Sequence, residues 1–217
     1  MGNLHSVEKA FERLGRRCNK VQHPADLKAI DALILPGVGS FDPAMANLTA
    51  TGLVPDLKAW GAADRPLLGI CLGLQLLFEA SDEGSKPGLG LLQGQVQRLP
   101  ADAGERIPHM GWAPLQKQND CPLLGRADPP GWVYFVHSYA AIPETSGDLK
   151  ATTAFGNRQV TAMVWRGRIS ACQFHPEKSA TSGERILSRW LNWLDEGAPS
   201  VPCAPTGSCG LAAVAGC

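Results

Sequence analysis

Cys71 is the residue with the clearest chemical potential, because it lies in a G-x-C-x-G segment, Gly69–Gly73. An apolar run over residues 66–70 precedes it, and a helical pattern over residues 72–80 follows it. A strand, a sharp turn and a helix in this order form the context in which a G-x-S-x-G elbow exposes its nucleophile. A thiol at the start of a helix can form a reactive thiolate and attack a carbonyl carbon. The same segment also fits an unreactive buried cysteine. A reactive cysteine requires a base elsewhere in the chain, so the presence of a candidate base decides between the two interpretations.

His175 is the candidate base, and Glu177 its candidate partner, in the segment Phe174–Glu177. A thiol that attacks an amide needs a group that takes its proton and returns it to the leaving ammonia. Imidazole does both near neutral pH. A carboxylate that accepts from the second ring nitrogen fixes the tautomer. A lone His-Pro-Glu is typical of a surface loop, so its pairing with the elbow is what favours a Cys71–His175–Glu177 triad.

Gly37, Val38 and Gly39 follow another apolar run, residues 32–35. Glycines at this place allow backbone N–H groups to turn toward the negative charge that develops on a carbonyl oxygen. An ordinary turn between a strand and a helix fits these residues equally well. They are therefore a candidate oxyanion site only if the fold brings them beside the thiol.

The elements that must position these groups are short strands that alternate with helices. Uninterrupted apolar runs are typical of strands buried on both faces. Their alternation with helical patterns, such as residues 4–14 capped by Asn3, predicts an α/β fold: a doubly wound, mostly parallel sheet with helices on both faces. Alternating segments at residues 95–99, 133–136, 160–165 and 169–173 predict additional antiparallel strands. A capping box at residues 181–184 predicts the start of the last helix.

Composition describes one globular domain: 217 residues, of which 44% are hydrophobic and 18% charged. The formal net charge of zero favours a small-molecule substrate or a protein partner over nucleic acid or a membrane. No apolar run approaches the roughly 18 residues of a membrane span, and no signal peptide begins the sequence, so we expect a cytoplasmic location. The domain is predicted over residues 1–197. The tail, residues 198–217, contains Pro, Ala and Cys and is predicted to be disordered.

The seven cysteines include no CxxC pair and no spacing typical of metal ligands. We therefore expect no metal and no cofactor. Apart from Cys71, each is best interpreted as a small buried residue or a free surface thiol.

Six motifs together carry a resemblance to a known family: residues 1–4, 36–41, 69–77, 109–112, 135–139 and 173–179. Over nearly all of residues 1–195, the sequence resembles the class I (triad-type) glutamine amidotransferases. Within that family, the PGVG, HMGW and Gly-Asn-Leu segments are similar to those of the glutaminase subunits of imidazole glycerol phosphate synthase, which act in histidine biosynthesis.

The resemblance implies that Cys71 attacks the carboxamide of glutamine, that His175 moves the proton and that Glu177 orients His175. It also implies an oxyanion and substrate site made by Gly37, Val38, Gly39, Leu72, Gln75, Ser138 and Tyr139. The implied partner is a (β/α)8-barrel cyclase subunit, which forms a heterodimer with the glutaminase and uses the ammonia to make imidazole glycerol phosphate and AICAR. The implied interface residues are Asn3, Ser6, Tyr139 and Lys178.

The sequence departs from the family pattern in three places. Family members carry an apolar strand before the segment that matches Met1–Leu4, and we expect this strand to lie upstream of Met1. The tail after Gly197 is outside the pattern, and Ala113 stands where the family commonly has Asn. Three alternatives remain open: an amidotransferase subunit of a nucleotide, anthranilate or pyridoxal-phosphate pathway, a catalytically impaired binding subunit, and a cysteine peptidase or chaperone with a related elbow.

Overall fold

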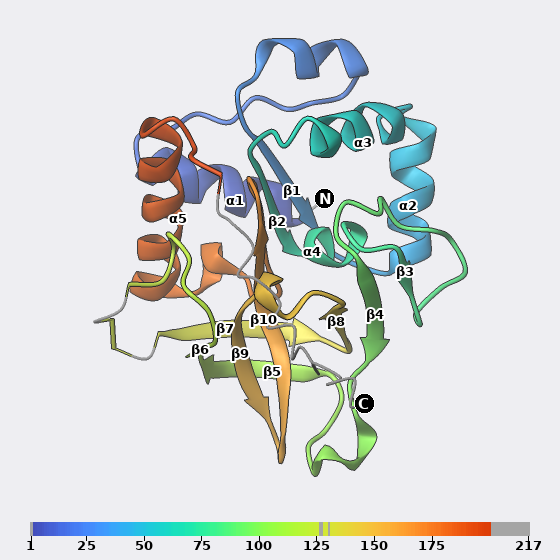
Figure 1. Cartoon of the computed structure of the whole chain (residues 1–217), viewed down its shortest axis with the longest axis vertical. Helices are drawn as coiled ribbons and strands as arrows, with labels where there is room; N and C mark the ends of the chain where they lie inside the picture. Colours follow the sequence, from blue (N-terminus) through green and yellow to red (C-terminus); the bar gives the residue numbers. More distant parts are fainter. Residues whose placement is uncertain (1, 126–127, 130, 201–217) are drawn as a thin grey trace, which may run out of the picture.

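The computed structural model (Figure 1) describes residues 2–125, 128–129 and 131–200, with the side chains of residues 2, 3 and 103 left aside. The helices are α1 Gly2–Arg13, α2 Phe41–Ala50, α3 Val54–Ala62, α4 Leu72–Leu76 and α5 Ala180–Asp195, with 3-10 turns η1 Pro24–Ala29, η2 Ala101–Ala103, η3 Ser146–Asp148 and η4 Pro176–Lys178. The strands are β1 Leu33–Gly37, β2 Leu67–Cys71, β3 Ala80–Ser81, β4 Gly94–Arg98, β5 His109–Pro114, β6 Gln116–Lys117, β7 Trp132–His137, β8 Tyr139–Pro143, β9 Leu149–Phe155, β10 Arg158–Arg166 and β11 Ile169–Cys172.

A six-stranded sheet in the order β1-β2-β11-β10-β9-β6 forms the centre of the molecule. Strands β1, β2 and β11 run parallel, and β10, β9 and β6 extend the sheet by antiparallel pairing. In the parallel part, Gly37 lies opposite Cys71, and Ile70 lies opposite Cys172. The carboxyl ends of the three strands therefore meet at one edge, where α/β sheets hold their ligands.

Helices cover both faces of this sheet, as Figure 1 shows for α1 and α5 on one side and α2 and α3 on the other. Strand β2 is buried along its whole length. Its Leu68 and Ile70 pack with Phe11 of α1 and Trp190 of α5, whereas Leu67 packs in a second core with residues of α2, α3 and α4. The predicted α/β class with helices on both faces is confirmed. The added antiparallel strands are also present, in β4–β8, β5–β7 and β9–β10.

Several local predictions were wrong. The helix after Cys71 ends at Leu76, not at Ala80. The carbonyl groups that would continue it accept hydrogen bonds from the loop at residues 88–92 instead, such as Leu89 N–H to Leu76 O at 2.8 Å. The strand at residues 169–172, expected among the antiparallel additions, also pairs in parallel with β2, because it completes the buried parallel core.

The two predicted helix caps were also wrong. Helix α5 begins at Ala180, so Thr181 lies inside it, because η4 runs directly into α5 through Ser179. The Ser179 hydroxyl makes no cap; it donates to His175 O at 2.6 Å and accepts from Tyr134 N–H at 2.9 Å. Helix α1 begins at Gly2, so Asn3 lies within it, a displacement of the size common at helix ends.

The end of the described chain packs against the domain. Ala198 is buried, and its carbonyl oxygen accepts from the Arg168 side chain at 2.6 Å. The rest of the predicted disordered tail, residues 201–217, lies outside the described residues. Among the helices that are described, none combines the length and apolar character needed to cross a bilayer.

Candidate active site

Cys71 occupies a strained turn between β2 and α4. Its backbone has φ 56° and ψ −113°, a region that costs a non-glycine residue about 1–3 kcal/mol. The chain can keep this strained turn because the helix that follows it, α4, packs directly against β1. A Cβ on Gly73 would be 1.7 Å from the Leu35 carbonyl oxygen, so glycine is required there. The predicted elbow is therefore present as a strand, a strained cysteine and a helix.

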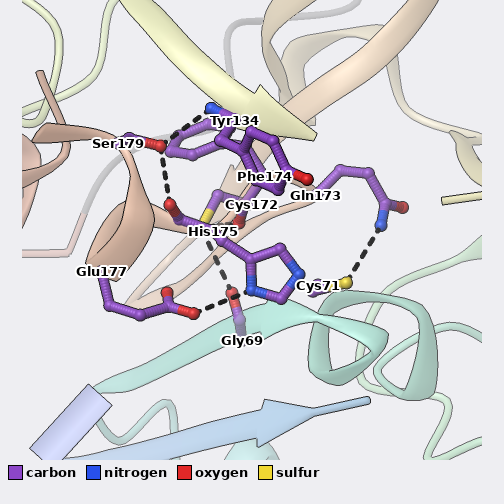
Figure 2. A network of polar contacts seen from close by, with 9 residues as sticks. All are labelled: Gly69, Cys71, Tyr134, Cys172, Gln173, Phe174, His175, Glu177 and Ser179. Atoms are coloured by element: carbon purple, nitrogen blue, oxygen red, sulfur yellow. Dashed lines mark hydrogen bonds and ion pairs between the residues drawn. The ribbon is translucent and has the colours of Figure 1, made fainter. Parts of the chain in front are cut away.

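His175 lies between the end of β11 and η4 and is held from three sides. Its backbone N–H donates to Tyr134 O at 3.0 Å, and its carbonyl oxygen accepts from Ser179. The ring Nδ1 lies 2.8 Å from Glu177 Oε1, and both side chains are almost completely buried. In Figure 2 the opposite edge of the ring points toward Cys71.

The protonation state of His175 follows from these contacts. Burial disfavours the charged ring, but the hydrogen bonds from Cys71 and Glu177 outweigh burial and raise the pKa of His175 to about 9. At neutral pH the ring is therefore an imidazolium beside the sulfur of Cys71. This form has a proton ready for a leaving amine, and Glu177 stabilises its charge.

A cavity of ≈ 350 Å³ opens beside these residues, within the size range of small-molecule sites. Most of the residues predicted for catalysis and substrate binding line it: Val38, Gly39, Cys71, Leu72, Gln75, Ser138, Tyr139 and His175. Gly37 and Glu177 do not. A Cβ on Gly37 would be 2.9 Å from Gly73 N, so this glycine allows β1 and α4 to approach each other. Gly39 has φ +96°, a conformation that favours glycine.

Four further residues line the cavity that sequence reasoning did not select: Glu83, Pro108, Val136 and His137. Glu83 supplies the carboxylate among the described lining residues, and its Oε2 accepts from Phe41 N–H at 2.9 Å. No motif surrounds Glu83, so the sequence offered no signal for it. His137 lies in the segment 135–139 that contributed to the resemblance, which could have pointed to it.

His137 is held neutral in the wall of the cavity. Burial is the main reason that its pKa falls to about 3, although a hydrogen bond with the Tyr139 carbonyl oxygen opposes the shift. Its Nδ1 lies 2.8 Å from that oxygen, and its Nε2 lies 3.2 Å from Nδ1 of His109. Because a carbonyl oxygen only accepts, Nδ1 of His137 carries the proton. His137 is thus suited to hold structure rather than to transfer protons at neutral pH.

The described residues predicted for a partner interface lie on three elements, α1, β8 and η4, of which α1 and η4 are in contact. Ser6 on α1 and Tyr139 at the start of β8 are partly buried, and Lys178 in η4 is exposed. The side chain of Asn3 lies outside the described part of the structure. A different surface stands out: the outer face of the β5–β7 ribbon, made by Met110, Trp112, Pro114, Trp132, Tyr134 and Val136.

This outer face of β5–β7 is unusually apolar. Met110, Trp112 and Trp132 are 62%, 49% and 55% exposed. Trp112 lies opposite Tyr134 in the strand register, and their ring centroids are 6.0 Å apart. Contiguous exposed apolar groups of this kind mark surfaces where another molecule binds. Sequence reasoning missed them because alternation within a strand does not say which of its two faces is covered.

No group of three or more His, Cys, Asp or Glu side chains within the described ranges could hold a metal ion.

Comparisons with known proteins agree with the resemblance found in the sequence motifs. The sequence profile described as "Glutamine amidotransferase class-I" matches residues 1–192. The chain is 66% identical to imidazole glycerol phosphate synthase subunit HisH 2 of Prochlorococcus marinus (strain MIT 9313), covering 93% of this chain and 95% of that protein. It is 69% identical to the HisH subunit of Synechococcus sp. (strain CC9902), covering 93% and 94%.

Solved structures are similar in fold at lower identity. A crystal structure of a glutamine amidotransferase superposes with a TM-score of 0.68 at 21% identity, covering 87% of this chain and 92% of the other. The structure of PurLQS from Thermotoga maritima gives 0.67 at 19% identity, covering 88% and 92%. At these identities the likeness shows the fold alone.

Proposed function

The chain belongs to the class I glutamine amidotransferase family, and we propose that it is the glutaminase subunit of an imidazole glycerol phosphate synthase. The observation that carries this proposal is the buried Cys71, His175 and Glu177 arrangement beside a cavity of small-molecule size. The HisH subunits of Prochlorococcus marinus and Synechococcus sp., with 66% and 69% identity over nearly the whole chain, support the choice of this branch of the family. The proposed location is the cytoplasm, as the sequence led us to expect.

In the proposed reaction, the proton of the Cys71 thiol is transferred to His175, which becomes the imidazolium, and the sulfur attacks the carboxamide carbon of glutamine. The negative charge that forms on the carbonyl oxygen is stabilised by backbone N–H groups near Val38 and Leu72, both of which line the cavity. His175 gives its proton to the amide nitrogen, the C–N bond breaks and ammonia leaves. The product at this stage is a glutamyl thioester on Cys71 with a neutral His175 ring.

Water completes the cycle. The neutral His175 ring accepts a proton from the attacking water, the C–S bond breaks, and glutamate is released with the sulfur again beside an imidazolium. Glu177 holds the ring through both half-reactions by accepting from Nδ1, 2.8 Å away. A neutral ring without this partner would rotate more freely and lose its tautomer.

The rest of the cavity fits the amino-acid part of glutamine. Glu83 provides a carboxylate for its α-ammonium group, since a cation in such a cavity needs an opposite charge. Gln75, Ser138 and Tyr139 supply polar groups for the remaining hydrogen bonds. This assignment accounts for the predicted substrate residues and adds Glu83 to them.

The proposed partner is the (β/α)8-barrel cyclase subunit, to which the ammonia passes. The apolar outer face of β5–β7 is the surface that we propose for binding this partner. Exposure of Met110, Trp112 and Trp132 to water is unfavourable in free energy, and a bound protein would remove it. An amidotransferase subunit of another pathway would carry the same triad, so the identity of the partner has to be tested directly.

The test is reconstitution with a cyclase subunit. We expect glutamine-dependent formation of imidazole glycerol phosphate, and a Cys71→Ala variant that loses it at least about 1000-fold while the complex still uses free ammonia. Cys18→Ala, at a partly buried free cysteine, is the matched control and should keep full activity. Glutamine hydrolysis that survives Cys71→Ala would disprove the catalytic assignment. Glutamine hydrolysis without any effect of the cyclase would point to a different pathway.

A further inference from the structure

Gln173 is a fully buried polar residue in contact with the nucleophile. Its Nε2 lies 3.9 Å from Cys71 Sγ, a contact drawn in Figure 2, and its Oε1 accepts from Gln75 Nε2 at 3.1 Å. It follows β11 directly, and its backbone N–H donates to Ala162 O at 2.9 Å. Gln173 is not among the residues that line the cavity.

The orientation of the Gln173 amide is fixed by its neighbours. The nitrogen and oxygen of an amide can exchange places, so the surrounding hydrogen bonds decide which atom faces the sulfur. Gln75 Nε2 lies 3.1 Å from the Tyr139 carbonyl oxygen, which can only accept, so Gln75 presents its NH2 group on this side. The second hydrogen of that NH2 group points to Gln173, which must offer its oxygen. The NH2 group of Gln173 is thereby directed to Cys71.

The Tyr139 carbonyl oxygen is itself fully used. It accepts from Gln75 Nε2 and from His137 Nδ1, which occupies its two lone pairs. All of these side chains are buried, with exposures of 6% for His137, 4% for Gln75 and 0% for Gln173. A reversed Gln75 amide would place a buried oxygen against the Tyr139 and Gln173 oxygens, and a reversed Gln173 amide would place its NH2 group against the NH2 group of Gln75. Either reversal leaves buried polar groups unpaired, which costs more than a normal hydrogen bond contributes. The donors therefore point in one direction along the network.

We propose that Gln173 is a positioning residue for Cys71: its NH2 group donates to the sulfur and holds the nucleophile in the rotamer that faces His175 and the cavity. A donor stabilises a sulfur anion more than a neutral thiol, because hydrogen bonds to ionised acceptors are stronger. A fixed rotamer also removes conformations from which attack is impossible. This inference rests on the proposed function only in that Cys71 is the nucleophile.

The test measures Cys71 itself. The full chain is alkylated with iodoacetamide at neutral pH, and the rate is followed by mass spectrometry of the peptide that carries Cys71. Gln173→Leu removes the donor and should slow the reaction about three- to tenfold. Gln173→Glu keeps the length of the side chain and an acceptor for Gln75 but places an oxygen beside the sulfur, so it should slow the reaction at least as much.

Ser170→Ala is the matched control. Ser170 lies on β11, the strand that leads to Gln173, is fully buried and donates to Leu67 O at 3.0 Å, so its loss removes a comparable buried hydrogen bond away from the thiol. We expect a rate within about twofold of wild type for this variant. The proposal is overturned if Gln173→Glu, folded by circular dichroism, reacts at the wild-type rate. Equal slowing in Ser170→Ala would also overturn it, because the effect would then be general loosening of the strand.

Glutamine kinetics provide a second readout. Because Gln173 does not line the cavity, its variants should lower kcat about three- to tenfold and leave KM within about twofold. A rise in KM with unchanged kcat would contradict a positioning role for the nucleophile. The alkylation measurement needs no glutamine turnover. Slowed alkylation in an enzyme without any glutaminase activity would therefore leave the role of Gln173 standing and refute the proposed function.

Discussion

The charge on the His175 ring links the structure to the pH at which Cys71 can react. Its pKa of about 9 in the folded protein lies above the ordinary value of 6.5. The imidazolium therefore contributes stability that is fully present below about pH 6.5 and is lost as the pH rises through about 9. The reactive pair of sulfur and imidazolium should follow the same limit, and we expect activity to decline on the alkaline side near pH 9.

Glu177→Gln should move this alkaline limit. The variant keeps the shape of the side chain but removes the charge that helps to raise the pKa of His175, so the limit should fall by about one to two pH units. The measurement is the pH dependence of kcat/KM for glutamine hydrolysis. Glu184→Gln, which changes an exposed carboxylate on α5, is the control and should leave the profile unchanged. An unaltered limit in Glu177→Gln would argue against the orienting role of this residue.

Glu83→Gln should act on binding. If Glu83 pairs with the ammonium group of glutamine, loss of its charge should raise KM about 10- to 100-fold with a much smaller change in kcat. Steady-state kinetics with glutamine measure this directly. Glu79→Gln is a fair comparison, because the Glu79 carboxylate accepts from Gly94 N–H outside the cavity lining and should not affect KM. Unchanged KM in Glu83→Gln would assign the ammonium group to another part of the wall.

The contact between α4 and β1 decides whether the elbow can form. Only hydrogen fits at Gly73, because a Cβ would be 1.7 Å from the Leu35 carbonyl oxygen, and the backbone atom cannot move aside as a side chain can. The short α4 has no other place to lie while Cys71 keeps its strained turn. The element therefore positions the nucleophile by its packing, not by its length.

Gly73→Ala should lower the free energy of unfolding by at least about 2–3 kcal/mol and also reduce glutaminase activity, because α4 must move away from β1. Urea denaturation and glutamine turnover measure the two effects. Gly61→Ala on α3 is the control. Its Cβ would lie 2.6 Å from Leu91 Cδ2, the end of a flexible side chain, and alanine favours the helix. We expect a change below about 1 kcal/mol there. Full stability in Gly73→Ala would show that the approach of α4 to β1 can relax.

The molecule as a whole presents one side of the β5–β7 ribbon to solvent. The buried side of this ribbon carries Val133 and Phe135 in the core, so its outer face is free to bind another protein. A functional partner would cover Trp112 and its neighbours and leave the isolated chain stable without them.

Trp112→Ser should weaken the complex with the cyclase about tenfold or more without lowering the stability of the isolated subunit, since large aromatic residues dominate such interfaces. Titration calorimetry of the two subunits provides the Kd, and thermal unfolding provides the stability. Ile142→Ser on β8, at a side chain of similar exposure outside this face, should leave the Kd unchanged. An unchanged Kd in Trp112→Ser would place the cyclase on another surface.

The sequence by itself determined the α/β class, the elbow at Cys71 and the residues that could form a triad with it. These features depend on local order: a buried run, a tight turn and the residue types that follow. The local sequence did not predict where helices begin and end when backbone groups from other segments form the competing hydrogen bonds. The helix after Cys71 stops at Leu76 because the loop at residues 88–92 takes its carbonyl groups, and the cap expected at Thr181 is absent because η4 continues into α5.

Only the tertiary structure decided which polar groups surround the sulfur. Glu83 lies in the cavity and Gln173 donates to Cys71 because β2, β11 and the loop after α4 meet at one edge of the sheet. The high pKa of His175 likewise depends on the fold, because Cys71 comes from a distant segment and, together with the neighbouring Glu177, outweighs the effect of burial, which lowers the pKa. Sequence patterns report the periodicity of an element, whereas hydrogen bonds and desolvation depend on distances between elements, which exist only in the folded chain.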